Sequence, residues 1–174
     1  SASISVAIMM GISVNLIKKA IFEFKGVQRR FNYIFEHQQS IYYDDYAHHP
    51  TEIYELLRSI KTVYKSKKII SVFQPHRISR VNYLKHRFTK CFKFSDRVLL
   101  CPIYKAGENL KLKFDYFKFA KEIIRNSKVE LIMINNEREL AKYAKNNIYR
   151  DNIVIGMGAG TISNWMRNLP KLIK

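Results

Sequence analysis

Hydrophobic and polar positions follow two alternating patterns from residue 40 to the end of the chain. Short apolar runs predict buried strands at residues 41–44, 69–74, 97–101, 129–134 and 153–156. Between them, apolar side chains recur every three or four positions, which predicts helices at residues 51–64, 80–92, 115–125 and 137–146, with a last helix at 161–169. This alternation indicates right-handed crossovers and a mostly parallel sheet with helices on both faces, a Rossmann-like α/β fold.

The first forty residues follow a different pattern. Residues 1–24 predict two helices broken at Gly11, with apolar residues along one face of the second. Aromatic residues occupy every second position of 31–35, which predicts a strand that turns at 37–39 and pairs with the strand at 41–44. We therefore place a domain boundary between Arg30 and Phe31, with residues 1–30 as the end of a preceding domain and 31–174 as the α/β domain.

Composition narrows the class of protein. A chain of 174 residues with 47% hydrophobic and 13% aromatic residues forms a folded core, so a disordered protein is excluded. Cys91 and Cys101 lack the spacing of a metal or redox pair, which predicts core thiols in a reducing compartment, the cytoplasm. The apolar start of the chain is too short to span a bilayer and lacks a basic flank, so no membrane segment is expected.

The net charge of +17 has two interpretations. A strongly basic chain attracts nucleotides and other anions, and a basic nucleic-acid-binding module is one form of that alternative. The basic residues are, however, scattered along the whole chain rather than clustered. This distribution favours a solvated basic surface, and no nucleic acid is expected as a partner.

Four segments follow the predicted strands, at residues 44–49, 75–80, 102–108 and 156–161. Because the carboxyl ends of parallel strands meet at one edge of a sheet, we expect these segments to converge, although they are distant in sequence. They also hold most of the chemically unusual residues of the chain. The sequence therefore predicts a binding site at this edge.

Arg77 and Arg80 lie three positions apart, so their side chains can face the same way on a first helical turn. Two guanidinium groups suit a carboxylate or a phosphate. A pair of ordinary surface arginines is the alternative. The segment 102–108 contains Tyr104 and Glu108, and its simplest interpretation is a plain loop.

Asp44, Asp45, His48 and His49 form a compact acidic and imidazole-rich turn ahead of Pro50, which suits the first position of a helix. A metal site is disfavoured because neighbouring side chains diverge and no further cluster completes a ligand shell. Capping of the helix is the common role of such histidines. A third interpretation is that Tyr46 and His48 orient a small polar substrate.

Gly158, Ala159 and Gly160 belong to a glycine-rich turn that resembles a phosphate cradle, because glycines permit close approach of a ligand to the backbone. A short glycine-rich turn is also common as a simple connection between a strand and a helix. No phosphate-binding loop of the Gly-x-x-x-x-Gly-Lys-Ser/Thr type and no obvious Mg²⁺ ligands are present.

Four motifs together resemble the Mur ligase family, in family order and over nearly the whole chain: Tyr42 to Glu52, Phe73 to Arg80, Ile103 to Glu108, and Gly156 to Gly160. The resemblance implies the carboxy-terminal part of an ATP-dependent amide-forming ligase that joins L-alanine to UDP-N-acetylmuramate in peptidoglycan synthesis. A domain of a murein tripeptide recycling ligase is the alternative within the family. ATP and Mg²⁺ would be bound mainly by a central domain and the sugar nucleotide by an amino-terminal domain, both upstream of Ser1.

The resemblance also implies roles for particular residues. His76, Arg77 and Arg80 match positions that hold the L-alanine carboxylate and nearby substrate phosphates, and Tyr46 and His48 match positions close to the amino acid. Asp45 matches a carboxylate that reaches the ATP ribose. The resemblance also implies that Arg30 is a hinge arginine near the nucleotide, and that the turn of Gly158, Ala159 and Gly160 takes part in substrate binding.

No catalytic residue is expected within this part of the chain, and we expect it to be inactive alone. The family often has an acidic residue where this chain has Thr161, so no role is carried over there.

Overall fold

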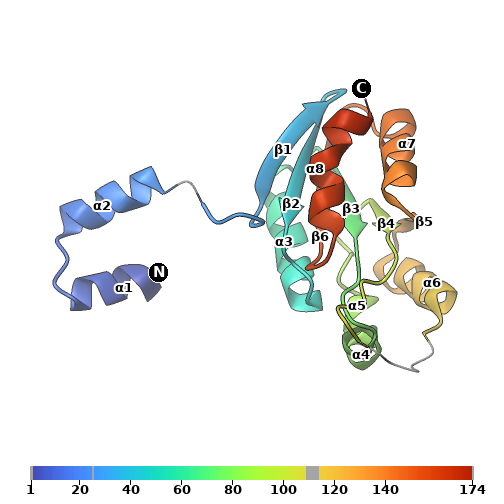
Figure 1. Ribbon diagram of the computed structural model, residues 1–174, viewed down its shortest axis with the longest axis horizontal. Helices are drawn as coiled ribbons and strands as arrows, with labels where there is room; N and C mark the ends of the chain where they lie inside the picture. Colours follow the sequence, from blue (N-terminus) through green and yellow to red (C-terminus); the bar gives the residue numbers. More distant parts are fainter. Residues whose placement is uncertain (1, 25, 109–113, 174) are drawn as a thin grey trace.

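The computed structural model describes residues 2–24, 26–108 and 114–173. Within these residues, six strands form one sheet in the order β1-β2-β6-β3-β4-β5 (Figure 1). The strands are β1 (Asn32–His37), β2 (Ser40–Asp45), β3 (Lys68–Phe73), β4 (Arg97–Leu100), β5 (Glu130–Met133) and β6 (Asn152–Met157). Only β1 pairs antiparallel, and all other neighbours are parallel. The predicted mostly parallel α/β sheet is confirmed.

Helices cover both faces of the sheet. On one face pack α3 (Pro50–Val63), α5 (Lys85–Phe88) and α6 (Tyr116–Ser127), and α4 (Ile78–Tyr83) adds its Val81 to the same core. The other face carries α7 (Glu137–Asn147) and α8 (Ile162–Leu172). Strand residues alternate between the two cores, as Ile69 and Ile70 of β3 do. This alternation explains why each strand is apolar on both sides.

The predicted helix at residues 80–92 is wrong in detail. The structure has two short helices, α4 and α5, separated by Leu84. The first of them, α4, begins two residues before the predicted start at residue 80. Leu84 has φ −100° and ψ 13°, which is outside the helical range. Val81 and Phe88 are both buried, so both helices turn apolar residues inward. The sequence pattern is therefore that of one helix even though the backbone breaks.

The predicted amino-terminal hairpin is present, but its alternation is interrupted. A register shift between Tyr33 and Phe35 of β1 acts as a β-bulge. Phe31, ahead of the bulge, stacks on Tyr43 with ring centroids 4.2 Å apart, in the core beneath α3. Phe35, beyond the bulge, stacks at the same distance on Tyr42, in the core beneath α8. The bulge thus lets one strand contribute aromatic rings to both cores.

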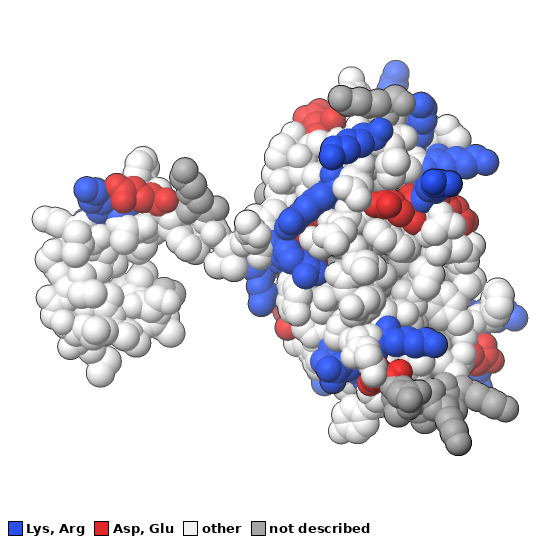
Figure 2. Space-filling model, in the orientation of Figure 1, with Lys and Arg blue, Asp and Glu red and all other residues white. Residues whose placement is uncertain are grey.

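The helices α1 (Ala2–Met9) and α2 (Val14–Glu23) lie apart from the sheet (Figure 1). They are separated near Gly11, whose φ of 77° is left-handed, as the predicted break requires. Neither helix has a buried residue. Figure 2 shows lysines and arginines dispersed over this face of the sheet domain, whereas the helix pair carries few charges.

Two further expectations concern the thiols and the membrane. Cys91 and Cys101 are free and buried, in agreement with their assignment as core thiols, and burial raises the pKa of each. Over residues 2–24, 26–108 and 114–173, no helix is long and apolar enough to cross a membrane.

Candidate functional site

The site lies at the carboxyl edge of the sheet, where the chain leaves β2, β3 and β6. β6 lies between β2 and β3, yet its continuation, α8, packs on the opposite face of the sheet from α3. Neighbouring strands whose continuations diverge in this way leave a crevice at their carboxyl ends, which is the usual ligand position in open α/β sheets. The predicted convergence of the four segments arises from this topology.

Asp45 ends β2 and is 6% exposed. Its carboxylate accepts the backbone N–H of Phe31 at 2.8 Å and that of Ala47 at 2.7 Å. Burial raises the pKa of Asp45, and these two hydrogen bonds and the charge of Arg30 offset part of the rise. Asp45 therefore joins the residue before β1 to the turn after β2, and these bonds hold its carboxylate in place.

His49 caps α3. Its Nδ1 accepts the N–H of Thr51 at 3.3 Å, and Glu52 in turn accepts the N–H groups of His48 and His49 at 3.1 and 3.2 Å. Together these bonds form a capping box. Burial acts to raise the pKa of Glu52, but the two N–H donors and the nearby imidazoles hold it below its ordinary value. The capping interpretation thus applies to His49. The ring of His48 instead contacts the rings of Tyr46 and His76.

The rings of His48 and His76 hold their protons on different nitrogens. Nδ1 of His48 lies 3.0 Å from the carbonyl oxygen of Tyr46, which only accepts, so Nδ1 is protonated. Nδ1 of His76 lies 3.4 Å from Nη1 of Arg80, which only donates, so this nitrogen is unprotonated. In this tautomer, Nε2 of His48 is a hydrogen-bond acceptor. Burial and the charges of Arg80, His48 and Arg77 lower the pKa of His76.

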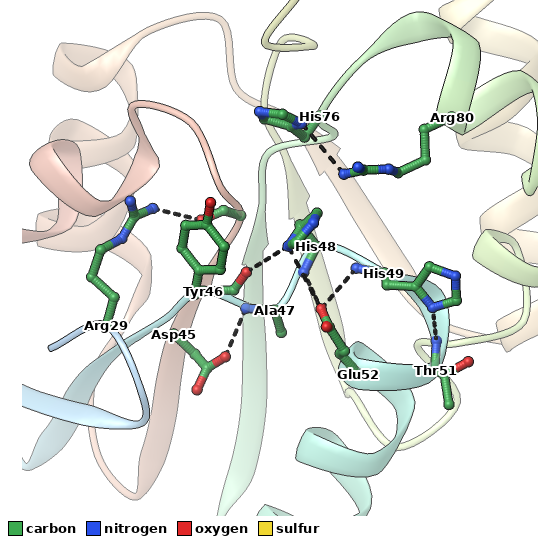
Figure 3. A network of polar contacts seen from close by, with 11 residues as sticks. Arg29, Asp45, Tyr46, Ala47, His48, His49, Thr51, Glu52, His76 and Arg80 are labelled. Carbon is green, nitrogen blue, oxygen red and sulfur yellow. Dashed lines mark hydrogen bonds and ion pairs between the residues drawn. The ribbon is translucent and has the colours of Figure 1, made fainter. Parts of the chain in front are cut away.

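Figure 3 shows Tyr46, His48, His76 and Arg80 gathered between the continuations of β2 and β3. The ring centroids of Tyr46 and His48 are 5.1 Å apart, those of His48 and His76 are 5.8 Å apart, and Tyr104 stacks on His76 at 5.5 Å. The structure thus brings the histidine-containing turn and the arginine segment to the same rim of the sheet. A row of rings links Tyr46 to Tyr104.

Arg77 and Arg80 differ in their surroundings. Arg80 is half-buried on α4, whereas Arg77 is exposed and begins that helix with a left-handed φ of 67°. The N–H of Arg77 donates to the carbonyl of Tyr104 at 2.9 Å. Both positive charges act on His76. The pair therefore presents cationic charge beside the imidazole, which suits a small anion.

The glycines of the turn after β6 are explained by packing within the protein. A Cβ on Gly158, which has φ 152°, would lie 2.8 Å from the carbonyl oxygen of Gln74. A Cβ on Gly160 would meet the side chains of Gln74 and Tyr104 at 2.5 and 2.6 Å. The phosphate cradle predicted for Gly158, Ala159 and Gly160 therefore does not follow from the glycines themselves, and it stays a prediction.

Gln74 is a site residue that sequence reasoning missed. Its side chain is buried, with Nε2 donating to Thr161 at 3.0 Å and Oε1 accepting the N–H of Ile162 at 3.1 Å. Gln74 thus holds the beginning of α8 against the end of β3. Thr161, at a position often acidic in the family, serves here as the partner of Gln74.

Arg29 is a second missed residue. Its Nη2 donates to the carbonyl of Gly158 at 2.8 Å and contacts that of Gly160 at 3.4 Å, and its guanidinium lies 4.6 Å from the centre of the Tyr46 ring (Figure 3). Arg30 is exposed and lies farther from that ring, at 5.9 Å. The Arg-Arg doublet is the signal in the sequence, and the nucleotide role expected of Arg30 stays a prediction. Arg29 is the arginine that the fold incorporates into the site.

Metal ligation has no support in the described residues. Over 2–24, 26–108 and 114–173, no group of three His, Cys, Asp or Glu side chains is arranged to hold a metal ion.

A family model and several proteins of known function resemble this chain. The model of the Mur ligase glutamate ligase domain matches residues 29–160. The UDP-N-acetylmuramate–L-alanine ligase of Pelagibacter ubique is 58% identical over 173 residues, which is 99% of this chain and 37% of that protein. The enzyme of the same name from Hydrogenobaculum is 36% identical over 170 residues, 98% of this chain and 37% of that protein.

Solved structures agree with these sequence relatives. The crystal structure of UDP-N-acetylmuramate–alanine ligase from Thermotoga maritima superimposes with a TM-score of 0.76 and 27% identity, over 97% of this chain and 35% of that one. A murein peptide ligase from Psychrobacter arcticus has a TM-score of 0.70 at 18% identity, over 98% of this chain and 35% of that one, which shows a shared fold alone. The chain spans little more than a third of the length of the relatives it matches.

Proposed function

The chain belongs to the Mur ligase family, and on this premise we propose that it is the amino-acid-positioning domain of an ATP-dependent ligase that joins L-alanine to UDP-N-acetylmuramate. The observation that carries the proposal is the meeting of His48, His76 and Arg80 at one rim of the sheet. The sequence similarity to the Pelagibacter enzyme supports it independently. The complete enzyme would work in the cytoplasm, where ATP is available.

The rim offers complementary groups for an amino acid. Arg80 and Arg77 supply guanidinium donors for a carboxylate, and Nε2 of His48 is an acceptor for the amino group in the tautomer that has its proton on Nδ1. Tyr46 and His76 add ring surfaces on either side of His48. An amino acid held at both ends would present its amine in one orientation. Orientation of this kind supplies several kcal/mol, on the order of 7 or more in favourable cases, towards the barrier of a bond-forming step.

Arg30 and Asp45, the residues expected near ATP, are less clearly arranged to bind a ligand. Arg30 is exposed and free to reach a nucleotide, but both oxygens of Asp45 already accept backbone N–H groups. Asp45 would therefore meet a ribose only through its remaining lone pairs. When bound, ATP supplies the activation of the carboxylate, and Mg²⁺ would be held by other parts of the enzyme. The contribution of this domain is to bring the amino acid to that centre and to exclude water.

The alternatives have weaker support. The likeness to a murein peptide ligase concerns the fold, and at 18% identity it does not extend to a tripeptide substrate. For nucleic-acid binding, stacking needs exposed aromatic rings, whereas most rings here lie in or against the two cores. Nucleic-acid affinity that disappears between about 50 and 200 mM salt would revive that alternative.

The proposal is tested by substitution of the arginines in the full-length ligase. Arg80→Ala and Arg77→Ala are each expected to raise the KM for L-alanine by about 10- to 100-fold, the value of a charge-assisted hydrogen bond, with the KM for ATP changed by less than about 2-fold. Arg58→Ala on α3, an exposed arginine paired with Glu55, is the matched control and leaves both constants unchanged. An equal rise in both constants would contradict the clamp.

A further inference from the structure

The loop after β4 is joined to the site through Tyr104. The N–H of Tyr104 donates to the carbonyl of Pro75 at 2.8 Å, and its own carbonyl accepts the N–H of Arg77 at 2.9 Å. These two bonds flank His76, so that His76 and Tyr104 form an isolated parallel β-bridge. The backbone of the loop is thereby held in register with the backbone at His76. Nothing in the local sequence pattern distinguishes this loop from an ordinary connection.

The ring of Tyr104 lies between His76 and the glycine-rich turn. It stacks on the imidazole with centroids 5.5 Å apart and an interplanar angle of 27°. It also closely approaches Gly160, where any Cβ would be 2.6 Å from Cγ of the tyrosine. The stacked ring thus restrains the imidazole of His76, which also has an edge-on contact with His48. It also explains why position 160 has no side chain.

Two hydrogen bonds hold Glu108, which lies later in the same loop. Glu108 accepts hydrogen bonds from the hydroxyl of Ser79 and, at 3.3 Å, from its backbone N–H. Ser79 is in the first turn of α4 and directly precedes Arg80. The loop therefore holds both members of the His76–Arg80 pair, His76 through the stacked ring and Arg80 through the start of its helix.

Tyr104 does not behave as a residue of the hydrophobic core. It is 38% exposed, and it belongs to neither core cluster of the described residues. An exposed aromatic ring contributes little to folding compared with a buried one. Its contacts are instead with the site, on His76 and against Gly160. This combination is typical of a side chain that supports a binding group.

We propose that Tyr104 is a positioning residue for amino-acid binding, which acts by holding the imidazole of His76 in the orientation that accepts a hydrogen bond from Arg80. The inference rests on the proposed function and adds to it a residue outside the arginine and histidine motifs. Without the stacked ring, His76 turns more freely and Arg80 loses its fixed partner. The guanidinium is then no longer aimed at the carboxylate, although ATP binding is untouched.

The test compares Tyr104→Phe, which keeps the ring, with Tyr104→Leu, which removes it. In the full-length ligase, Tyr104→Leu is expected to raise the KM for L-alanine by about 3- to 10-fold, the value of an aromatic pair, with the KM for ATP unchanged and near-complete rescue by Tyr104→Phe. Tyr83→Leu is the matched control, because Tyr83 is an 88% exposed tyrosine on α4.

A second measurement needs no substrate. NMR titration of His76 in the present chain is expected to show its pKa rising towards the ordinary value in Tyr104→Leu, because the imidazole becomes more hydrated, and staying low in Tyr104→Phe. Tyr104→Gln, which suits an exposed position, repeats the test if the leucine variant does not fold.

The outcomes separate the two hypotheses. If Arg80→Ala raises the KM for L-alanine but loss of the ring does not, the positioning role is overturned and the proposed function stands. Equal changes in both KM values, or failure of Tyr104→Phe to rescue, also overturn it, because they indicate a merely structural role. If Arg80→Ala has no effect, the proposed function fails, and the titration alone decides whether Tyr104 positions His76.

Discussion

The α1–α2 pair and the sheet domain both contain helices with apolar side chains, but these side chains are buried only in the sheet domain. In the sheet domain, the apolar faces of the helices are buried against two cores. In the pair, large apolar side chains remain exposed, as Met9 is at 86% and Phe22 at 92%. Helices of 8 and 10 residues are marginal in water without packing. A helical pattern thus predicts a helix but does not say what covers its apolar face.

The difference bears on the domain boundary, which stays a prediction. We placed it between Arg30 and Phe31. The contacts of Arg29 with Gly158 and Tyr46 favour a boundary a residue or two earlier, because Arg29 belongs structurally to the sheet domain. An exposed apolar surface such as that of α1 and α2 is typical of an interaction face. We propose that α1 and α2 pack on a neighbouring part of the complete enzyme.

The largest expected effect contrasts two phenylalanines. Phe73→Ala, at a fully buried position of β3, should lower the free energy of unfolding by about 3–5 kcal/mol through lost burial and a cavity. Phe22→Ala on α2 should change it by less than about 0.5 kcal/mol. Urea unfolding of both variants measures the contrast. Similar losses for the two would mean that the helix pair folds together with the sheet domain.

A smaller effect contrasts two glutamates. Glu52→Ala removes the acceptor of the α3 cap and should cost about 0.5–1 kcal/mol near neutral pH, with partial exposure limiting the electrostatic part. The pKa of Glu52 is held below its ordinary value of 4.5 in the folded state, so its contribution is present above that pH and is lost as the pH falls through the folded pKa.

The measurement is the difference in unfolding free energy between wild type and variant at several pH values. It should be constant near neutral pH and shrink as the pH falls below the ordinary pKa of 4.5 and through the lower folded pKa, as Glu52 becomes protonated. Glu23→Ala on α2 is the control, since Glu23 forms an exposed pair with Lys19 at 4.0 Å. A difference that is constant across this range would mean that the charge of Glu52 is not involved.

The smallest effect is expected from removal of the helix pair itself. A chain of residues 29–174 keeps Arg29 and both cores, so its unfolding free energy should match that of the full chain within about 1 kcal/mol, the order of a single exposed interaction. Circular dichroism during urea unfolding would show a loss of helical signal without a change in midpoint. A large drop in the midpoint would show that α1 and α2 support the sheet domain after all.

Much of the fold was predictable because the signals are local. The apolar runs at β3 and β6, and the Pro50 start of α3, lie where the sequence analysis expected them. The gathering of His48, His76 and Arg80 at one rim also followed from the rule that parallel strands end at the same edge. The break at Leu84 was not predictable, because α4 and α5 bury residues with the spacing of a single helix.

The outline of the site was predictable from the sequence, but the contacts within it were not. The motif that seemed least informative, around Tyr104, turned out to contact His76 and Gly160 directly. The glycines that suggested a ligand cradle are required by Gln74 and Tyr104. Both cases have the same origin, since a residue type states what a side chain is able to do and not which partner it meets.

Local periodicity was sufficient to establish the strands, the helices, their parallel arrangement and the edge at which the polar segments converge, because these depend on residues a few positions apart. The partners within that edge depend on strand register. Arg29 meets Gly158 across 129 positions, and Gln74 meets Ile162 across 88. Those pairings exist because β2 and β3 both lie beside β6, and the packing of all three decides them together.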